Sequence, residues 1–224
     1  MILAGRVLVN EQKIDKPGAS VDPASAIRLL GSELRYVSRG GLKLEAALVH
    51  WGIDLTGVIG VDIGTSTGGF TDCMLQHGAA GVVAVDTGFG QIAEMLRRDA
   101  RVIRRERTNA RLLAAGELLG ELPAGARAPA FLAMDVSFIS ATLVLPAVLA
   151  ALSAPGYRWA GHAVVLVKPQ FEAGRENVDK GGIVRDLEAR EAAVERGGEG
   201  VEVIDSPILG REGNHEFLLH GRFG

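Results

Sequence analysis

The sequence predicts an α/β fold in which a mainly parallel sheet carries helices on both faces. Short apolar runs with strand character alternate with longer segments of helical periodicity, which is the pattern of parallel strands joined by helices. Three of the apolar runs end on a charged residue, namely Asp86, Asp135 and Lys168. The chain also has 30 glycines and only 5% aromatic residues, which indicates many tight turns. Sheets of this kind bind ligands at the carboxyl ends of their strands.

The individual elements follow from the spacing of apolar residues. The expected helices span residues 42–51, 68–77, 91–98 and 140–152, and Pro146 predicts a kink in the last of them. The expected strands span residues 58–63, 81–86, 101–106, 130–136 and 163–168, and residues 200–223 are expected to form two more around the glycine-rich turn 210–213. Residues 116–129 are rich in Gly, Ala and Pro and are expected to form a surface loop.

The first 35 residues differ from the rest of the chain. They contain a short extended pattern at residues 6–10 and a turn at Pro17-Gly18, and they lack the apolar content of a core. A segment of this length does not normally fold alone. We therefore expect two parts, a small N-terminal segment with its linker at residues 1–35 and the main domain at residues 36–224.

Composition excludes several classes of protein. With 224 residues, 47% hydrophobic and 23% charged, the chain can bury a sizeable core and is not mainly disordered. The single cysteine, Cys73, excludes a disulfide framework and a multi-cysteine zinc site, and we expect no metal; it fits a reducing compartment such as the cytoplasm. No apolar run reaches the ~20 residues of a membrane-spanning helix. Because the net charge is −3, nucleic-acid binding would have to depend on a local patch.

The strongest local signal is a glycine-rich turn between an expected strand and an expected helix. Small residues let the backbone approach a ligand, and a helix N-terminus offers free N–H groups. Asp86 ends the next strand, where a carboxylate can bind a ribose diol. The turn is neither a Walker motif nor a GxGxxG loop, and a plain turn with two solvated acids is the alternative interpretation. The candidate ligand-binding residues here are Asp62, Gly64, Ser66, Thr67, Gly68, Gly69, Phe70 and Asp86.

Four charged residues form a candidate catalytic set. Asp135 and Lys168 each end an apolar strand, so both are expected at the edge of the sheet that carries the glycine-rich turn. A buried lysine beside a carboxylate can transfer protons, although a structural ion pair is an equal alternative. Lys43, at the start of the first helix, and Glu216, before the last strand, complete the set. Taken alone, each of these two is more typical of a solvated surface charge.

The order Lys43, Asp135, Lys168, Glu216 resembles the Lys-Asp-Lys-Glu tetrad of the FtsJ-like ribose 2′-O-methyltransferases. The resemblance is closer still to the TlyA family, also labelled haemolysin A. Its hallmarks match YVSRGGLKLE at 36–45, TGGFTDC at 67–73, ERTN at 106–109, DVSFIS at 135–140, KPQFE at 168–172 and SPILG at 206–210.

The family resemblance implies a Rossmann-like methyltransferase fold with a seven-stranded sheet. It implies S-adenosylmethionine as cofactor, with Asp62 near its methionine part, Asp86 on its ribose, and Asn109 and Asp135 also in its pocket. The implied substrate is ribosomal RNA within the ribosomal subunits, methylated at the 2′-oxygen of a cytidine of 16S or 23S rRNA. In that mechanism Lys168 would accept or stabilise the proton of the 2′-hydroxyl, and Asp135 would hold the ammonium of Lys168. Lys43 and Glu216 would orient the ribose.

The N-terminal segment is similar to the second half of an S4 RNA-binding domain. Candidate RNA contacts are Arg6, Lys13, Arg35 and Arg39. A second basic run, residues 97–111, has seven arginines against two acids, and a solvated strand edge is the commoner meaning of such a run. Two other functions stay open, a membrane-active protein and an RNA-binding chaperone without catalysis. The oligomeric state is not predicted.

Overall fold

The computed structural model describes residues 7–14, 16, 18–29, 35–123, 125–172, 202–210 and 213–224. It divides into two compact units, Met1–Leu34 and Arg35–Gly224. Of the residues predicted to contact RNA, Arg6 lies outside the described residues, and only the backbone of Lys13 is described.

The first unit contains a small antiparallel sheet. Its strands are β1 (Val7–Val9), β2 (Gln12–Ile14) and β3 (Ile27–Leu29), in the order β2-β1-β3. Asn10 connects this sheet to the chain before β3, because its N–H donates to the carbonyl oxygen of Ala26 and its side chain accepts from the N–H of Ala26. Among the described residues of this unit, the buried hydrophobic side chain is that of Leu8, so the apolar core is small, as the composition predicts.

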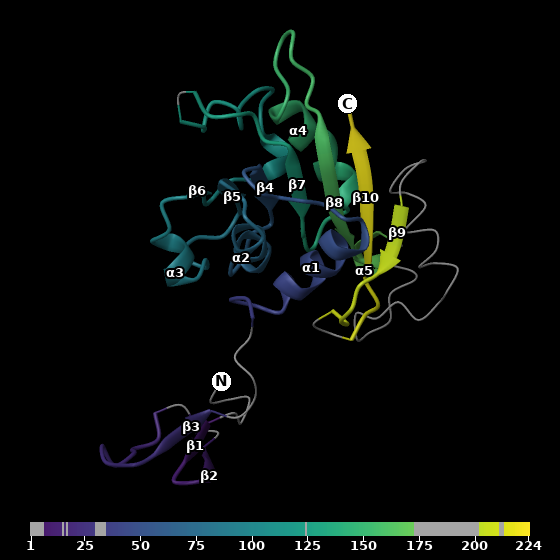
Figure 1. Ribbon diagram of the computed structural model, residues 1–224. Helices are drawn as coiled ribbons and strands as arrows, with labels where there is room; N and C mark the ends of the chain where they lie inside the picture. The colour runs from purple at the N-terminus through teal and green to yellow at the C-terminus, as the bar shows by residue number, and fades with distance from the viewer. Residues whose placement is uncertain are drawn as a thin grey trace. The chain divides into compact units, whose positions relative to one another are not determined.

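The second unit is built on a seven-stranded sheet, which confirms the predicted fold class (Figure 1). The sheet has the order β6-β5-β4-β7-β8-β10-β9, and only β10 runs against its two neighbours. The chain builds β4, β5 and β6 outward and then returns to place β7 on the other side of β4. The carboxyl ends of β4 and β7 therefore mark the switch in strand order, where α/β sheets bind ligands. The strands are β4 (Ile59–Ile63), β5 (Gly81–Val85), β6 (Val102–Arg105), β7 (Phe131–Met134), β8 (Gly161–Val167), β9 (Glu202–Asp205) and β10 (Phe217–Phe223).

Helices cover both faces of this sheet, as predicted. One core joins α1 (Gly40–His50), α2 (Gly69–Gln76) and α3 (Glu94–Arg97) to strand residues such as Val82 and Leu166. The other core joins α4 (Ala141–Ala151) to the neighbouring strand residues, such as Val83 and Val165. Successive strand residues point to opposite faces, so apolar runs that are continuous in sequence feed both cores.

Two local predictions need correction. The helix expected over residues 91–98 is only α3, because the backbone of Ala93 is extended and its N–H donates to the carbonyl oxygen of Thr67. Residues 116–129 are not a loop that lies entirely on the surface. Leu118 is fully buried, and Arg105 of β6 forms ion pairs with Glu117 and Glu121, which fix this segment to the sheet.

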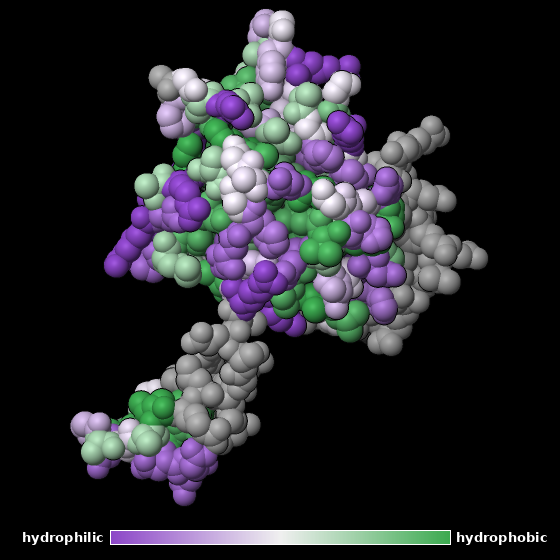
Figure 2. Space-filling model, in the orientation of Figure 1, coloured by the Kyte–Doolittle hydropathy of each residue, from purple (hydrophilic) through white to green (hydrophobic). Residues whose placement is uncertain are grey.

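The visible face of the second unit mixes hydrophilic and hydrophobic side chains (Figure 2). In the described part of the chain, no helix combines the length and the apolar character needed to cross a lipid bilayer. The large hydrophobic side chains that are exposed are distributed over different elements; they include Val49 on α1, Met95 on α3, Leu143 on α4 and Phe138 in the loop after β7.

Candidate active site

The loops at the carboxyl ends of the parallel strands converge on one cleft of about 780 Å³. The glycine-rich turn after β4 lies in the middle of the cleft, and Asp86 and Asn109 lie on one side of it. The loops after β7 and β8 form the other side, together with the residues that precede β10. This is the location that the switch in strand order predicts.

The glycine-rich turn fits closely against its neighbours. Gly64 has a φ of +84°, and a Cβ atom there would lie 2.3 Å from the carbonyl oxygen of Asp135. Gly68 has a φ of +97°, and a Cβ atom there would lie 2.3 Å from Leu96 Cδ1. Only glycine satisfies both the left-handed backbone and the close approach at these two positions. The turn therefore packs closely against the loop that carries Asp135, and its residues Gly64, Ser66 and Thr67 line the cleft.

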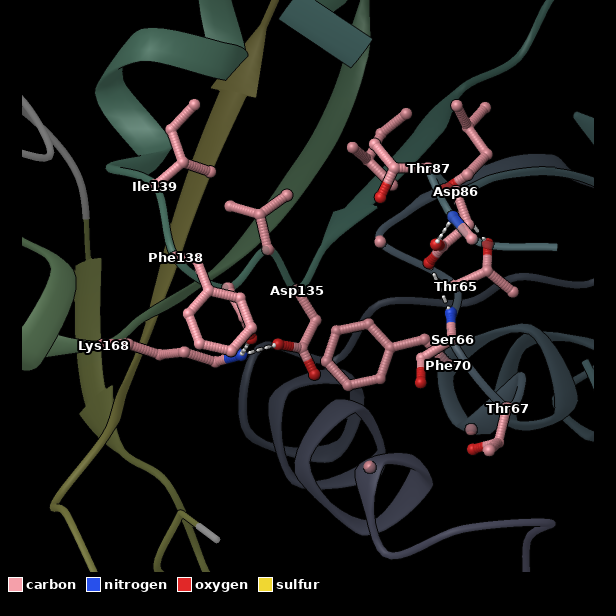
Figure 3. A pocket seen from close by; sticks show the side chains of 18 of the residues that line it. Thr65, Ser66, Thr67, Phe70, Asp86, Thr87, Asp135, Phe138, Ile139 and Lys168 are labelled. Atoms are coloured by element: carbon pink, nitrogen blue, oxygen red, sulfur yellow. Dashed lines mark hydrogen bonds and ion pairs between the residues drawn. The ribbon is translucent and has the colours of Figure 1, made fainter. Parts of the chain in front are cut away.

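Asp86 connects the glycine-rich turn after β4 to the loop after β5. One carboxylate oxygen accepts from the N–H of Ser66 at 2.7 Å, and the other accepts from the N–H of Gly88 at 2.6 Å (Figure 3). An ionised carboxylate has about four acceptor positions, so these two bonds leave capacity for a ligand hydroxyl. Asp86 thus organises the glycine-rich turn in addition to lining the cleft.

Asp62 lies beneath the turn, and it is not among the residues that line the cleft. Its side chain is fully buried, and one oxygen accepts from the N–H and the hydroxyl of Thr71 at 3.0 and 2.6 Å. Burial raises the pKa of Asp62 to about 7; the hydrogen bonds from Thr71 oppose this shift, and the charges of Asp135 and Asp86 add to it. The structure places Asp62 as a support for α2, one layer below the position expected for a ligand contact.

Replacing Asp62 should change how stability depends on pH. A carboxyl whose pKa is higher in the folded than in the unfolded chain binds more protons when folded, so stability falls as pH rises between the two pKa values. Between pH 5 and pH 7, we expect the wild type to lose up to about 1.4 kcal/mol per pH unit relative to Asp62→Asn. Urea unfolding of both proteins across this range measures the difference. Parallel stability curves would show that Asp62 is ionised throughout.

The loops after β7 and β8 bring Asp135 and Lys168 together. Lys168 Nζ lies 2.5 Å from a carboxylate oxygen of Asp135 and donates to the hydroxyl of Ser137 at 2.7 Å. Figure 3 shows the two charged side chains pointing toward one another, with Phe138 and Ile139 in the same loop as Asp135. Both strands end at this edge of the sheet, with Met134 paired to Val165, and this register makes the contact possible.

A second ion pair joins residues far apart in sequence. Lys43 Nζ, in the first turn of α1, contacts a carboxylate oxygen of Glu216, just before β10. Only 8% of Lys43 and 4% of Glu216 is exposed, so neither is the solvated surface charge that it resembles in isolation. The two ion pairs line the same cleft, as the tetrad resemblance implies.

Most of the predicted site residues meet in this cleft. Gly68 shapes the turn but is not among the lining residues, and Asp62 is covered. Arg39 is exposed at the cleft, whereas Arg35 forms an ion pair with Glu45. The predicted residues that line the cleft are Arg39, Lys43, Gly64, Ser66, Thr67, Gly69, Phe70, Asp86, Asn109, Asp135, Lys168 and Glu216.

Several residues of this cleft were not predicted from the sequence as site residues. Ser137 contacts Lys168, and Phe138 is 91% exposed with a φ of +66°. Leu209 comes from the segment between β9 and β10. Ser137 and Phe138 lie within three residues of Asp135, so proximity to a charged strand end was the signal that could have found them.

The fold and the cleft define a class of protein, the Rossmann-like methyltransferases. Residues 36–223 match the family model described as FtsJ-like methyltransferase. The solved structure of a provisionally named hemolysin from Streptococcus thermophilus superimposes with a TM-score of 0.77 at 43% identity, covering 98% of this chain and 79% of that one.

Two curated relatives match over nearly the whole chain. A provisionally named rRNA methyltransferase of Bacillus subtilis, YqxC, is 47% identical over 227 residues, which is 98% of this chain and 77% of that protein. TlyA of Mycobacterium tuberculosis, named as a 16S/23S rRNA (cytidine-2′-O)-methyltransferase, is 40% identical over 228 residues, which is 98% of this chain and 81% of TlyA. The chain belongs to the FtsJ-like methyltransferase family.

Proposed function

We propose that this protein transfers a methyl group from S-adenosylmethionine to the 2′-oxygen of a cytidine ribose in ribosomal RNA. The observation that carries the proposal is the pair of ion pairs in one cleft, Lys168 with Asp135 and Lys43 with Glu216. The match to the FtsJ-like family and the printed name of the TlyA relative support it.

The lining of the cleft supports S-adenosylmethionine as the cofactor. Gly64, Ser66 and Thr67 of the glycine-rich turn line the cleft together with the carboxylates Asp86 and Asp135. We propose that Asp86 accepts hydrogen bonds from the ribose of the cofactor and that Asn109 lies beside its adenine. Asp135 would lie beside the sulfonium, whose positive charge favours a negatively charged neighbour. When bound, the cofactor supplies a methyl group on a positively charged sulfur.

The two ion pairs of the cleft are the groups that would bind and activate the 2′-hydroxyl of the RNA ribose. The 2′-hydroxyl must lose its proton as its oxygen forms a bond to the methyl carbon and the carbon–sulfur bond breaks. In its neutral form, Lys168 accepts that proton on Nζ, and Asp135 then stabilises the ammonium that results. Asp135 and Ser137 fix the position of Nζ, while Lys43 and Glu216 hold the ribose. Positioning of the two reactants supplies much of the acceleration.

The ion pairs of the arginine-rich run, residues 97–111, narrow the set of arginines that are free to contact RNA. Four of its seven arginines have carboxylate partners, for example Arg101 with Asp99. Within the described part of the chain, Arg104, Arg107 and Arg111 form no ion pair. Arg107 stacks on the ring of Phe89 at 4.2 Å and precedes the cleft residues Thr108 and Asn109. We propose that Arg107 and Arg111 contact RNA phosphates beside the cleft.

Removing these two arginines should weaken RNA binding and reduce its dependence on salt. Each RNA phosphate that the protein no longer neutralises lowers the salt slope by roughly 0.7–0.9. We therefore expect a smaller slope and a lower affinity for the double variant Arg107→Ala/Arg111→Ala in a filter-binding titration at two salt concentrations. The matched control is the double variant Arg98→Ala/Arg101→Ala, because both arginines are exposed but paired, with Glu94 and Asp99. Equal reductions in the variant and the control would mean that only net charge matters.

We propose that the first unit also binds ribosomal RNA, as part of an S4-like module, through Arg6 and Lys13. The sequence resemblance supports this assignment. A methyl-transfer assay on ribosomal subunits, followed by mapping of the modified nucleotide, tests the proposed function as a whole.

A further inference from the structure

We propose that Glu172 is a positioning residue that holds Lys168 against Asp135. It would do so by fixing α5 (Pro169–Glu172), which follows Lys168 directly, to the start of α4. The inference rests on the proposed function, because it assigns Glu172 a role in placing the proposed base.

Glu172 is a buried carboxylate that the proposed mechanism does not use. Only 6% of it is exposed. One of its oxygens accepts from the N–H of Ala141 at 2.7 Å, and the other accepts from the hydroxyl of Ser140. Ser140 is the N-cap of α4 and accepts from the N–H of Thr142 at 3.2 Å. A carboxylate at a helix N-terminus is favoured by the helix dipole and by the free N–H groups there.

These contacts form the second of two links between the same two segments. Residues 135–141 and residues 168–172 are joined at one end by Lys168 with Asp135 and Ser137. They are joined at the other end by Glu172 with Ser140 and Ala141. Because only three residues separate Lys168 from Glu172, a shift of Glu172 is transmitted to the backbone of Lys168.

The loop between the two links includes a residue in an unfavourable backbone conformation. Phe138, in its middle, has a φ of +66°, a conformation that is costly for a bulky residue. Its side chain is 91% exposed, so burial does not compensate for the strain; its main ring contact is Phe171 of α5, at 5.4 Å between centroids. Val136 and Ile139 of this loop pack against the core, and Glu172 adds a polar contact at the end of the loop that leads into α4.

The expected consequence is a loss of rate without a loss of cofactor affinity. A misplacement of about 1 Å at a reacting group can cost 10²-fold in rate. For Glu172→Ala, we expect single-turnover methyl transfer to fall at least tenfold while the dissociation constant for S-adenosylmethionine changes less than twofold. Glu172→Gln keeps the size and one acceptor oxygen, so it should lose less. The control is Glu117→Gln, a carboxylate that likewise accepts a backbone N–H, from Ala114, remote from the cleft.

The split between kcat and KM separates positioning from stability. A displaced Lys168 lowers kcat, whereas the KM for S-adenosylmethionine stays at its wild-type value because the glycine-rich turn and Asp86 are untouched. A purely structural role would lower the melting temperature but leave kcat per folded molecule at its wild-type value.

Each outcome decides the question. A reduced kcat with an unchanged KM for S-adenosylmethionine in Glu172→Ala, and a partial recovery of kcat in Glu172→Gln, supports the proposal. An unchanged kcat in folded Glu172→Gln and Glu172→Ala would overturn it. If Glu172→Ala does not fold, the kcat of Glu172→Gln decides alone. Failure of the proposed function looks different, because the wild type itself would then transfer no methyl group to ribosomal RNA.

Discussion

Lys168→Ala is expected to abolish methyl transfer while S-adenosylmethionine affinity stays within a few-fold of wild type. Lys168 is the group that we propose accepts the 2′-hydroxyl proton, and its Nζ is held by Asp135 and Ser137. General-base roles typically contribute about 10²–10⁴-fold, so single-turnover rates should fall by at least 10²-fold. Cofactor affinity should persist because the glycine-rich turn and Asp86 are untouched. Calorimetry and a quenched-flow methyl-transfer assay measure the two quantities.

Lys168→Arg separates a proton acceptor from a positive charge. Arginine can keep an ion pair with Asp135, but its guanidinium does not lose a proton at accessible pH. We expect this variant to be as inactive as Lys168→Ala. A rate within about tenfold of wild type would show that Lys168 acts only as a fixed charge, and the general-base assignment would be wrong.

Glu216→Ala should cause the largest loss of stability of any variant discussed. It leaves the buried ammonium of Lys43 without its carboxylate. Breaking a buried ion pair from one side typically costs about 3–5 kcal/mol, because the remaining charge is not compensated. Urea unfolding of Glu216→Ala against wild type measures this loss.

Two further variants test whether the loss of stability in Glu216→Ala comes from the uncompensated charge of Lys43. Lys43→Met/Glu216→Leu removes both charges, so it should be more stable than Glu216→Ala. Glu94→Ala breaks an exposed pair with Arg98 and should cost less than about 1 kcal/mol. If Glu216→Ala and Glu94→Ala were equally stable, the pair of Lys43 and Glu216 would be open to water in solution.

The strand ends were predictable from sequence, and with them most of the site. Apolar runs that stop at Asp86, Asp135 and Lys168 define where the parallel strands end, and parallel strands place those ends at one edge. The contact between Lys43 and Glu216 was not predictable from local pattern, because 173 residues separate the two. Only the family resemblance placed these two residues in one set.

The roles of other residues depend on packing that the sequence does not encode locally. Asp62 follows the pattern of a ligand-binding acid, but the turn folds over it and leaves it bonded to Thr71. Asp86 was predicted to bind a ligand ribose, and both of its oxygens also accept from loop N–H groups. The local sequence around Glu172 does not predict its burial. Its contacts with Ser140 and Ala141 form only because α5 packs beside the start of α4.

The central claim is methylation of a ribose oxygen in ribosomal RNA, and one measurement tests it directly. Purified ribosomal subunits are incubated with the protein and S-adenosylmethionine carrying a labelled methyl group, and the RNA is then digested to nucleosides and separated by mass. We predict a labelled 2′-O-methylcytidine with the wild type and none with Lys168→Ala. Label on a base, or no label from wild-type protein that binds S-adenosylmethionine, would contradict the account.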